Sequence, residues 1–456
     1  MYPREESITV SETCVEIRLQ DLLDHTVSRL CLYLREVIEG LSDEYKTTLV
    51  LVTKWGCDGS QQSQFKQKFA NDDDSDANIF QSCLVPIRLS ASCNGCEKVV
   101  WQNPMPSSPR YCRPIRIRFV WETTKIIKKE IADIEAQVKD LQKSEVSITD
   151  SEIWKISHKL LPTMVDTKVC NAATSTTSAM RCYICGKTPQ QFNDISTSKT
   201  PKPDTFKFGL STLHARIRFF ESILHISYKM DFKKWQARTE AEKASVALSK
   251  QRIQQAFKSE MGLLVDMPKP GFGSTNDGNT ARRFFDDPET TSKITGVDLG
   301  LIQRLKIILE VITSGFEIDT AKFSAYAIET AQQYVRLYPW HPMTPTLHKI
   351  LIHGAIVVEN AILPIGLLSE EAGEARNKHF RQYRLNFSRK FSRVACNRDI
   401  LNRLLLSSDP LITSSRPKPK KKSEPFSAEA LQMLRAGCFI TDDTSDHDSD
   451  CSESSD

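Results

Sequence analysis

The chain has 456 residues and a net charge of +4; 40% of its residues are hydrophobic and 26% are charged. This length suggests two or three domains and leaves ample sequence for a hydrophobic core. There is no run of about 18 apolar residues, and the acidic, polar start MYPREESITVSET is not typical of a secretory signal. We therefore expect a mostly globular protein with no membrane span.

The charge is unevenly distributed along the chain. Residues 441–456 contain seven acidic residues and no Lys or Arg, which leaves a net charge of +11 on the rest. A basic body with an acidic, Ser-rich tail is common among proteins that meet nucleic acid, but a solvated surface with a solubilising tail explains the charge equally well. The 13 cysteines, an odd number at irregular spacing, indicate reduced thiols and a metal site in an intracellular compartment.

The first ~170 residues predict a mixed sheet with helices, which is typical of an α+β fold. Residues 12–41 have apolar spacing near 3.6 and predict a helical lead-in. The β-branched and apolar residues 47–54 predict a buried strand that ends in a turn at Gly56–Gly59. The remaining patterns predict strands and one amphipathic helix, namely strands at 79–90, 97–103, 113–122 and 152–166 and the helix at 122–142.

After Cys185 the pattern becomes helical. Residues 211–263 and 297–338 predict helices separated by the loop MPKPGFGSTNDGNT, and 369–406 predict a long basic helical region that Ser369 is placed to cap. From Ser407 the chain is rich in Ser, Pro and Lys and then acidic, which predicts disorder. Within it, the segment RPKPKKK suits nuclear import, with a disordered basic linker as the alternative.

Two cysteine pairs have the Cys-x-x-Cys spacing. Cys182 and Cys185 suit tetrahedral zinc, with two unlinked thiols near a turn as the alternative. Cys93 and Cys96 flank Asn-Gly, the strongest two-residue hairpin signal. We therefore expect the second pair to face across a hairpin rather than to bind metal.

The segment LHKILIHG carries His348 and His353, five positions apart. Two buried core histidines are the simpler interpretation, but the spacing lies in the range of zinc sites. Five positions rotate by about 140° on a regular helix, so joint ligation predicts a helix end or a bend. With Cys182 and Cys185, the histidines would form a structural site that joins the start of the helical region to its end.

Three separated carboxylates form the second candidate site. Asp58 follows the first predicted strand, Asp166 ends a later one and Glu374 lies on the late helix. An Asp-Gly turn explains Asp58 as well, and Glu374 could pair with Lys378 one helical turn away. Carboxylates that converge at a sheet edge can instead hold two divalent ions about 4 Å apart, which clamp the attacking and leaving oxygens of a phosphodiester. Mg²⁺ prefers such oxygen ligands.

Taken in order, these motifs resemble those of the Transib-type DDE transposases and the related catalytic subunit of the V(D)J recombinase. KWGCDGS resembles the segment around the first catalytic aspartate, and MVDTKVCNAATSTTSAMRCYIC the segment from the second aspartate to the zinc cysteines. LHKILIHGAIVVEN resembles the segment of the zinc histidines, and SEEAGEARNKHFRQYR the helix of the catalytic glutamate. The resemblance covers about residues 45–405, and the order and spacing of the motifs agree along it.

The resemblance implies an RNase H-like core that is interrupted by a large all-helical, zinc-stapled insertion before the last catalytic helix. The implied parts are a helical lead-in (1–44), the core (45–180), the insertion (181–358), the region of the catalytic helix (359–406) and a disordered basic then acidic tail (407–456).

The resemblance also implies two sets of metal ligands. The first would hold two catalytic Mg²⁺ or Mn²⁺ ions and consists of Asp58, Asp166 and Glu374, with Glu371 as the next choice for the glutamate. The second would hold one structural Zn²⁺ ion and consists of Cys182, Cys185, His348 and His353.

The implied function is that of a nuclear transposase or recombinase. It would nick double-stranded DNA and use the freed 3′-hydroxyl for strand transfer or hairpin formation, as a homodimer with an accessory subunit. Basic residues of the late helix would contact phosphates without reading sequence, with a solvated helix face as the alternative. These residues are Arg376, Lys378, Arg381, Arg384, Arg389, Lys390 and Arg393.

Two other classes compete with the enzyme. One is a domesticated, catalytically silent nuclear DNA-binding protein stabilised by zinc, and the other is a nuclear scaffold whose helical insertion binds protein partners. The intact carboxylate trio favours the enzyme. The short segment ahead of Asp58 favours the alternatives, because members of the family carry DNA-end-binding and dimerisation segments there.

Overall fold

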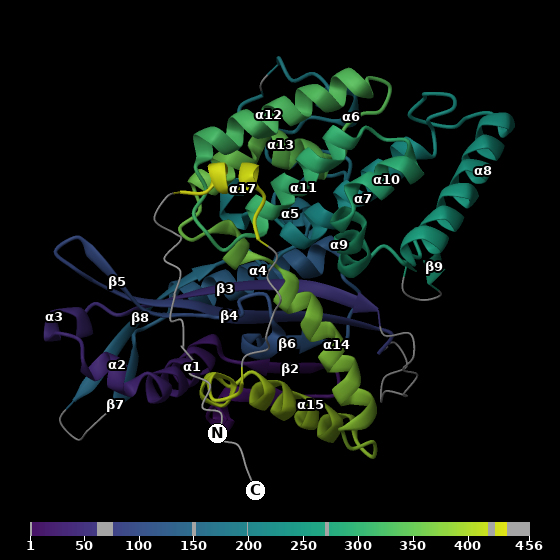
Figure 1. Ribbon diagram of the computed structural model, residues 1–456. Helices are drawn as coiled ribbons and strands as arrows, with labels where there is room; N and C mark the ends of the chain where they lie inside the picture. Colours follow the sequence, from purple (N-terminus) through teal and green to yellow (C-terminus); the bar gives the residue numbers. More distant parts are fainter. Residues whose placement is uncertain are drawn as a thin grey trace, which may run out of the picture.

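The computed structural model describes residues 2–61, 76–147, 152–197, 199–269, 273–417 and 425–435. Figure 1 shows a curled mixed sheet with a group of helices stacked beside it. One continuous cluster of buried apolar side chains extends from the sheet into the helices. The prediction of a mixed fold of helices and strands is confirmed at this level.

Eight strands of the described residues form one sheet in the order β1-β2-β6-β4-β3-β8-β7, with β5 paired to β4. Strand β8 is parallel to β3, and the other neighbours are antiparallel. The strands are β1 Ile8–Val10, β2 Cys14–Ile17, β3 Val50–Gln61, β4 Asn78–Cys93, β5 Cys96–Gln102, β6 Arg113–Arg118, β7 Ser144–Ser147 and β8 Ile153–Leu161.

Strand β3 lies between β4 and β8 and is almost continuously buried from Leu51 to Cys57, as expected for a strand covered on both faces. The predicted turn at Gly56–Gly59 is wrong, because β3 keeps pairing with β4 as far as Gln61. Gly56 is needed for another reason: a Cβ there would lie 1.8 Å from the carbonyl oxygen of Met164. The segment after β8 therefore passes directly over β3.

The helices near the sheet are α1 Leu19–Tyr33, α2 Arg35–Glu39, α3 Asp43–Lys46, α4 Thr124–Lys139, α5 Thr167–Ala173, α14 Glu371–Asn386, α15 Arg393–Ser407 and α16 Pro410–Ser414. Residues 12–41, predicted as one helical lead-in, hold strand β2 before α1 and α2. The predicted helical region at 369–406 is two helices, α14 and α15, separated by a turn at Phe387–Ser392.

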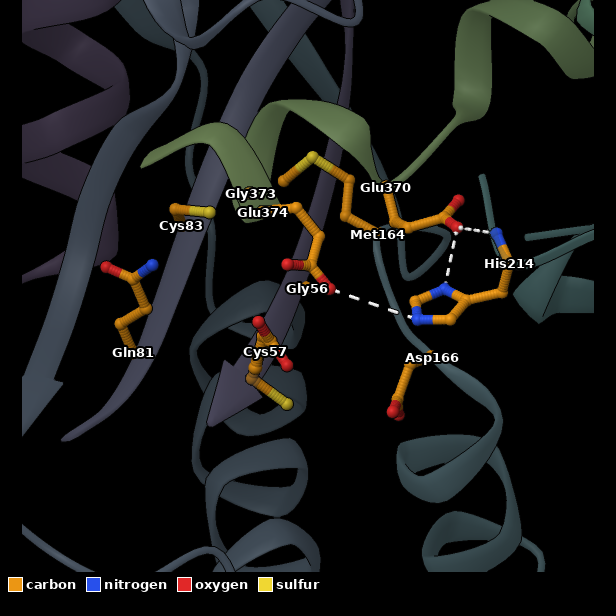
Figure 2. A pocket seen from close by; sticks show the side chains of 11 residues that line it. Gly56, Cys57, Gln81, Cys83, Met164, Asp166, His214, Glu370, Gly373 and Glu374 are labelled. Carbon is orange, nitrogen blue, oxygen red and sulfur yellow. Dashed lines mark hydrogen bonds and ion pairs between the residues drawn. The ribbon is translucent and has the colours of Figure 1, made fainter. Parts of the chain in front are cut away.

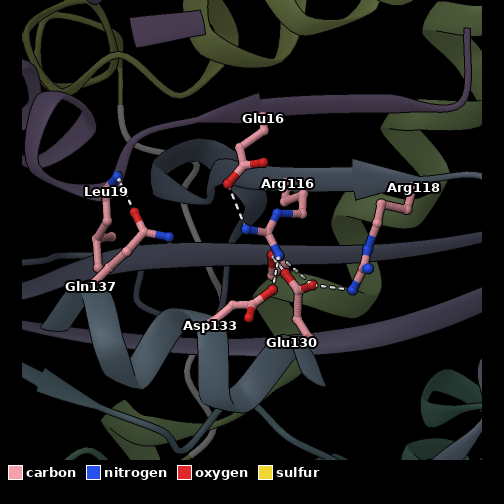
Figure 3. A network of polar contacts seen from close by, with 8 residues as sticks. Glu16, Leu19, Arg116, Arg118, Glu130, Asp133 and Gln137 are labelled. Carbon is pink, nitrogen blue, oxygen red and sulfur yellow. Dashed lines mark hydrogen bonds and ion pairs between the residues drawn. The ribbon is translucent and has the colours of Figure 1, made fainter. Parts of the chain in front are cut away.

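A buried network of charges joins α4 to the sheet (Figure 3). Glu130 of α4 is 1% exposed and accepts from the guanidinium groups of Arg116 and Arg118 on β6, and from the hydroxyl of Ser82 on β4. The alternating residues that predicted strand β6 also explain this network. They place Arg116 and Arg118 on one face of the strand, toward Glu130, and Ile117 on the other face.

The helices away from the sheet are α6 Pro189–Phe192, α7 Thr212–Ser227, α8 Glu240–Ala256, α9 Gly278–Asp286, α10 Pro288–Thr295, α11 Leu299–Thr313, α12 Thr320–Leu337, α13 Pro345–Glu359 and α17 Ala428–Met433. Helix α11 contacts α7, α12 and α17, and α12 contacts α13. Between α8 and α9, the predicted loop holds the short pair β9 Pro268–Lys269 and β10 Gly273–Ser274.

The prediction that the chain is disordered from Ser407 onward is wrong for two segments. Helix α16 packs against α1, and α17 packs against α11 and α12. Leu434 forms a β-bridge with Ile318. Residues 418–422 of the basic segment RPKPKKK (416–422) and the whole acidic tail 441–456 lie outside the described residues.

Candidate functional site

A pocket between the sheet and the helices brings the three predicted carboxylates together. Asp58 reaches it from β3, Asp166 from the start of α5 and Glu374 from the first turn of α14. Figure 2 shows the other walls: Gln81 and Cys83 of β4, Met164, His214 of α7, and Glu370. Elements far apart in sequence thus supply one acidic pocket.

Asp58 lies within β3, not after its end as predicted, and its carboxylate accepts a hydrogen bond from the Asn377 amide at 2.8 Å. Asn377 in turn accepts from Gln81 at 2.7 Å, so two amides orient the carboxylate. Burial, and then the negative charges of Glu374 and Asp166, hold the pKa of Asp58 well above its usual range. Both causes disfavour a negative charge on Asp58 in this pocket.

Asp166 was predicted to end a strand, but β8 ends at Leu161 and Asp166 caps helix α5. Its Oδ1 accepts from the backbone N–H of Val169 at 2.7 Å. This bond fixes the side chain at the mouth of the pocket and leaves its second oxygen for another partner.

Glu374 faces the pocket, and burial raises its pKa while the neighbouring His214 opposes the rise. Glu371, the alternative choice for the glutamate, is not part of the pocket lining, but Glu370 is. Sequence reasoning missed Glu370 because the run Ser-Glu-Glu-Ala-Gly-Glu places three carboxylates on one turn, and their spacing alone does not fix the rotation of the helix.

His214 is the second residue that the sequence did not indicate. Its Nδ1 lies 3.0 Å from Glu370 Oε1, and its Nε2 lies 3.9 Å from Glu374 Oε1 (Figure 2). Burial opposes a charge on the imidazole, but the hydrogen bond and charge of Glu370 outweigh it and raise the pKa of His214 to about 9. A cationic imidazole thus sits beside the carboxylates.

The side chain of Lys54 on β3 holds the segment that leads into α14. Its buried ammonium donates to the carbonyl oxygens of Leu367 at 2.9 Å and Ser369 at 2.7 Å, and burial lowers its pKa to about 8. The hydroxyl of Ser369, which was predicted to cap the helix, accepts from the backbone N–H of Glu371 at 3.2 Å, whereas the N-cap residue itself is Glu370, without a side-chain capping bond. Strand β3 therefore positions both Asp58 and the turn that carries Glu374.

The lining of the pocket is acidic. Carboxylate oxygens are the ligands that Mg²⁺ and Mn²⁺ prefer, and three carboxylates line the pocket, but among the described residues only the cysteine and histidine cluster described below has its ligand atoms close enough together to hold one ion. Glu370 Oε2 is buried without a hydrogen-bond partner, so the pocket also has an unsatisfied acceptor. Bound cations would offset the carboxylate repulsion that adds to burial in raising the pKa of Asp58.

A second cluster joins four buried side chains, Cys182, Cys185, His348 and His353. One ligand atom from each lies within 4.8 Å of all the others, so the cluster could hold a metal ion. His348 Nδ1 and His353 Nε2 are buried without hydrogen-bond partners. Two thiols and two imidazoles are a common donor set for tetrahedral zinc.

The backbone explains how the cluster forms. Cys182 and Cys185 lie in a tight turn closed by the bond from Gly186 N–H to Cys182 O at 2.7 Å. Both histidines lie on α13, which is unbroken from Pro345 to Glu359, so of the two predicted possibilities, a helix end or a bend, the structure has the helix end. His348 is in the first turn of that helix, and the two rings meet edge to face with centroids 5.1 Å apart. The other predicted pair, Cys93 and Cys96, faces across the β4–β5 hairpin as expected.

The predicted phosphate-binding residues divide into two groups. Arg376, Arg384 and Arg393 are buried and paired inside the protein, which makes their prediction as DNA contacts wrong in this structure. Arg376 donates to the carbonyl oxygens of Pro109 and Cys112, and the other two pair with Asp76. Lys378, Arg389 and Lys390 are exposed, and Arg381 is half-buried.

Comparison with known proteins adds no family assignment. No family model matches the chain, and no curated protein matches it. Among the described residues, no helix is both long and apolar enough to cross a membrane.

Proposed function

We propose that the chain is the catalytic region of a metal-dependent DNA transposase or recombinase. The observation that carries the proposal is the shared pocket of Asp58, Asp166 and Glu374, in which burial and then the charges of the other two carboxylates raise the pKa of Asp58. Three carboxylates in one pocket are what two-metal phosphodiester chemistry requires.

The order of the sheet supports an RNase H-like core. Antiparallel neighbours β6, β4 and β3 are followed by helix α4 and then by β8, which is parallel to β3. Asp58 lies on the first of these strands in the sequence, and the helices from α6 to α13 come between α5 and the glutamate helix α14. This is the arrangement that the resemblance implies.

Asp58, Asp166 and Glu374 would hold Mg²⁺ or Mn²⁺, which when bound activates water and stabilises the leaving oxygen. The protein's own part is to fix these carboxylates. Asn377 and Gln81 orient Asp58, and the N–H of Val169 holds Asp166. The substrate would be double-stranded DNA, nicked first and then attacked by the freed 3′-hydroxyl in strand transfer or hairpin formation.

The second cluster would hold one structural zinc ion and staple the helical insertion. Its cysteines follow α5 and its histidines lie on α13, so the ion would connect the two ends of the insertion. All four ligands are protein side chains, which leaves no open coordination position and excludes direct participation in the chemistry.

A nicking assay on supercoiled DNA with Mg²⁺ or Mn²⁺ tests the proposal. The parent protein should relax the DNA, and Glu374→Gln should reduce nicking to the level seen with EDTA while binding DNA at least as well, because a negative charge near phosphate is lost. Glu371→Gln is the matched control: it lies on the same helix turn outside the pocket lining and should keep activity.

The opposite result has a defined meaning. If parent and Glu374→Gln bind DNA equally and neither nicks it with either metal, the protein is a silent zinc-stabilised DNA-binding protein. If neither binds DNA, the scaffold interpretation replaces both.

A further inference from the structure

The turn between α14 and α15 exposes an unusual group of apolar side chains. Phe391 is 79% exposed, and Leu385, Phe387 and Val394 are 46%, 43% and 41% exposed. Single exposed apolar residues are normal on a protein surface, but four within ten positions form a patch that calls for a partner.

Two arginine side chains lie close to the aromatic rings of this patch. The guanidinium of Arg403 lies 4.7 Å from the centre of the Phe387 ring, and that of Arg389 lies 5.7 Å from the centre of the Phe391 ring. Lys390 is exposed at the same turn. Asp399, which pairs with Arg389, is the one carboxylate among the described residues that line the adjoining cavity. The patch therefore combines aromatic surface with positive charge and suits a negatively charged partner that has flat apolar faces.

Helix α14 connects this patch to the carboxylate pocket. Its first turn carries the pocket residue Glu374, and it ends at Asn386, the last residue before the turn; Figure 1 shows α14 as one helix that leads to α15. Thirteen residues separate Glu374 from Phe387, which corresponds to about 20 Å along a helix. At 3.4 Å for each base pair, this is the length of about six base pairs of duplex DNA.

We propose that the α14–α15 turn is a second DNA contact, in which Phe391, four residues beyond Phe387, acts as an apolar wedge against bases away from the scissile phosphate. The proposal rests on the proposed function for its choice of duplex DNA. Exposed Phe side chains can insert between base steps while neighbouring Lys and Arg hold the phosphates on either side. Lys390 and Arg403 supply that charge here.

The test measures binding of a 30-base-pair duplex to the full chain by fluorescence anisotropy at several salt concentrations. Phe391→Ala should weaken binding by about tenfold, as expected for the loss of one aromatic contact to a base, with the slope of log K against log salt unchanged. Lys390→Ala should reduce that slope by about one unit. Phe391→Trp should restore the affinity, and Leu248→Ala, an exposed apolar residue on α8, should have no effect.

Three results would overturn the wedge. Phe391→Ala could bind DNA as tightly as the parent, or Leu248→Ala could weaken binding equally. In the third, sedimentation would show that the parent self-associates and Phe391→Ala does not, which assigns the patch to a second copy of the chain. The two proposals fail separately. If nicking is lost in Glu374→Gln while Phe391→Ala nicks and binds DNA like the parent, only the wedge is removed; if the parent does not nick DNA but Phe391→Ala weakens binding, only the enzyme is removed.

Discussion

Arg384 and Arg389 are five positions apart, but the charge of Arg384 is buried and the charge of Arg389 is exposed. Arg384 is 2% exposed, pairs with the buried Asp76 and covers the ring of Phe119. Arg389 is exposed and pairs with Asp399 on the surface. Removing one partner of a buried pair leaves the other charge uncompensated, whereas an exposed pair contributes little.

We expect Arg384→Ala to lower the free energy of unfolding by about 3 kcal/mol and Arg389→Ala by less than about 1 kcal/mol. Urea unfolding followed by circular dichroism measures both. Arg384→Ala should also leave the salt dependence of DNA binding unchanged, because its guanidinium faces inward. A stable Arg384→Ala variant with a flatter salt dependence would show instead that the side chain leaves Asp76 to bind phosphate.

At the scale of elements, two Cys-x-x-Cys pairs allow a matched comparison. Cys182 and Cys185 lie beside two histidines, whereas Cys93 and Cys96 lie in a hairpin outside any described metal cluster. Cys182→Ser should therefore lose bound zinc and lower the melting temperature of the helical region, since metal binding is coupled to folding. Cys96→Ser should do neither.

Elemental analysis and thermal unfolding in the presence and absence of a chelator measure these outcomes. The parent should contain one zinc per chain and melt at a lower temperature after chelation. Folded parent protein without zinc would contradict the assignment, and so would equal zinc content in Cys182→Ser and the parent.

The elements that the sequence predicted well are those that local chemistry determines. The β4–β5 hairpin follows from Asn94 and Gly95, whose φ angles of 50° and 78° suit a tight turn. Helix α4 follows from its apolar periodicity. By contrast, the choice of Glu370 over Glu371 as a pocket residue depends on how α14 is rotated, and Lys54 sets this from 313 positions away in the sequence.

A usable signal for the buried arginines was present but overlooked. Arg376 and Arg384 lie four positions on either side of Phe380, so all three share one face of α14. Phe380 is 1% exposed and places that face inside the protein. No local signal pointed to His214, because its role depends on α7 meeting α14 across more than 150 residues.

For the molecule as a whole, the buried His341 contributes to the loss of stability in acid. His341 is 3% exposed, its Nδ1 lies 2.8 Å from the hydroxyl of Tyr334, and burial lowers its pKa to about 3. An unfolded histidine has a pKa of about 6.5. The unfolded chain therefore binds a proton between these values that the folded protein does not.

This difference between the folded and unfolded pKa of His341 makes the folded protein less stable as the pH falls. The contribution of a neutral His341 is fully present above pH 6.5 and is lost as the pH falls toward about 3, at up to about 1.4 kcal/mol for each pH unit. His341→Gln should have a lower free energy of unfolding than the parent at pH 7.5, because it loses packing. This difference in the free energy of unfolding should become steadily smaller between pH 6.5 and pH 4.5. Urea unfolding midpoints of the two proteins across this range measure the difference. A difference that stays constant with pH would mean that His341 is already protonated in the folded protein, and the acid sensitivity would then belong to other groups.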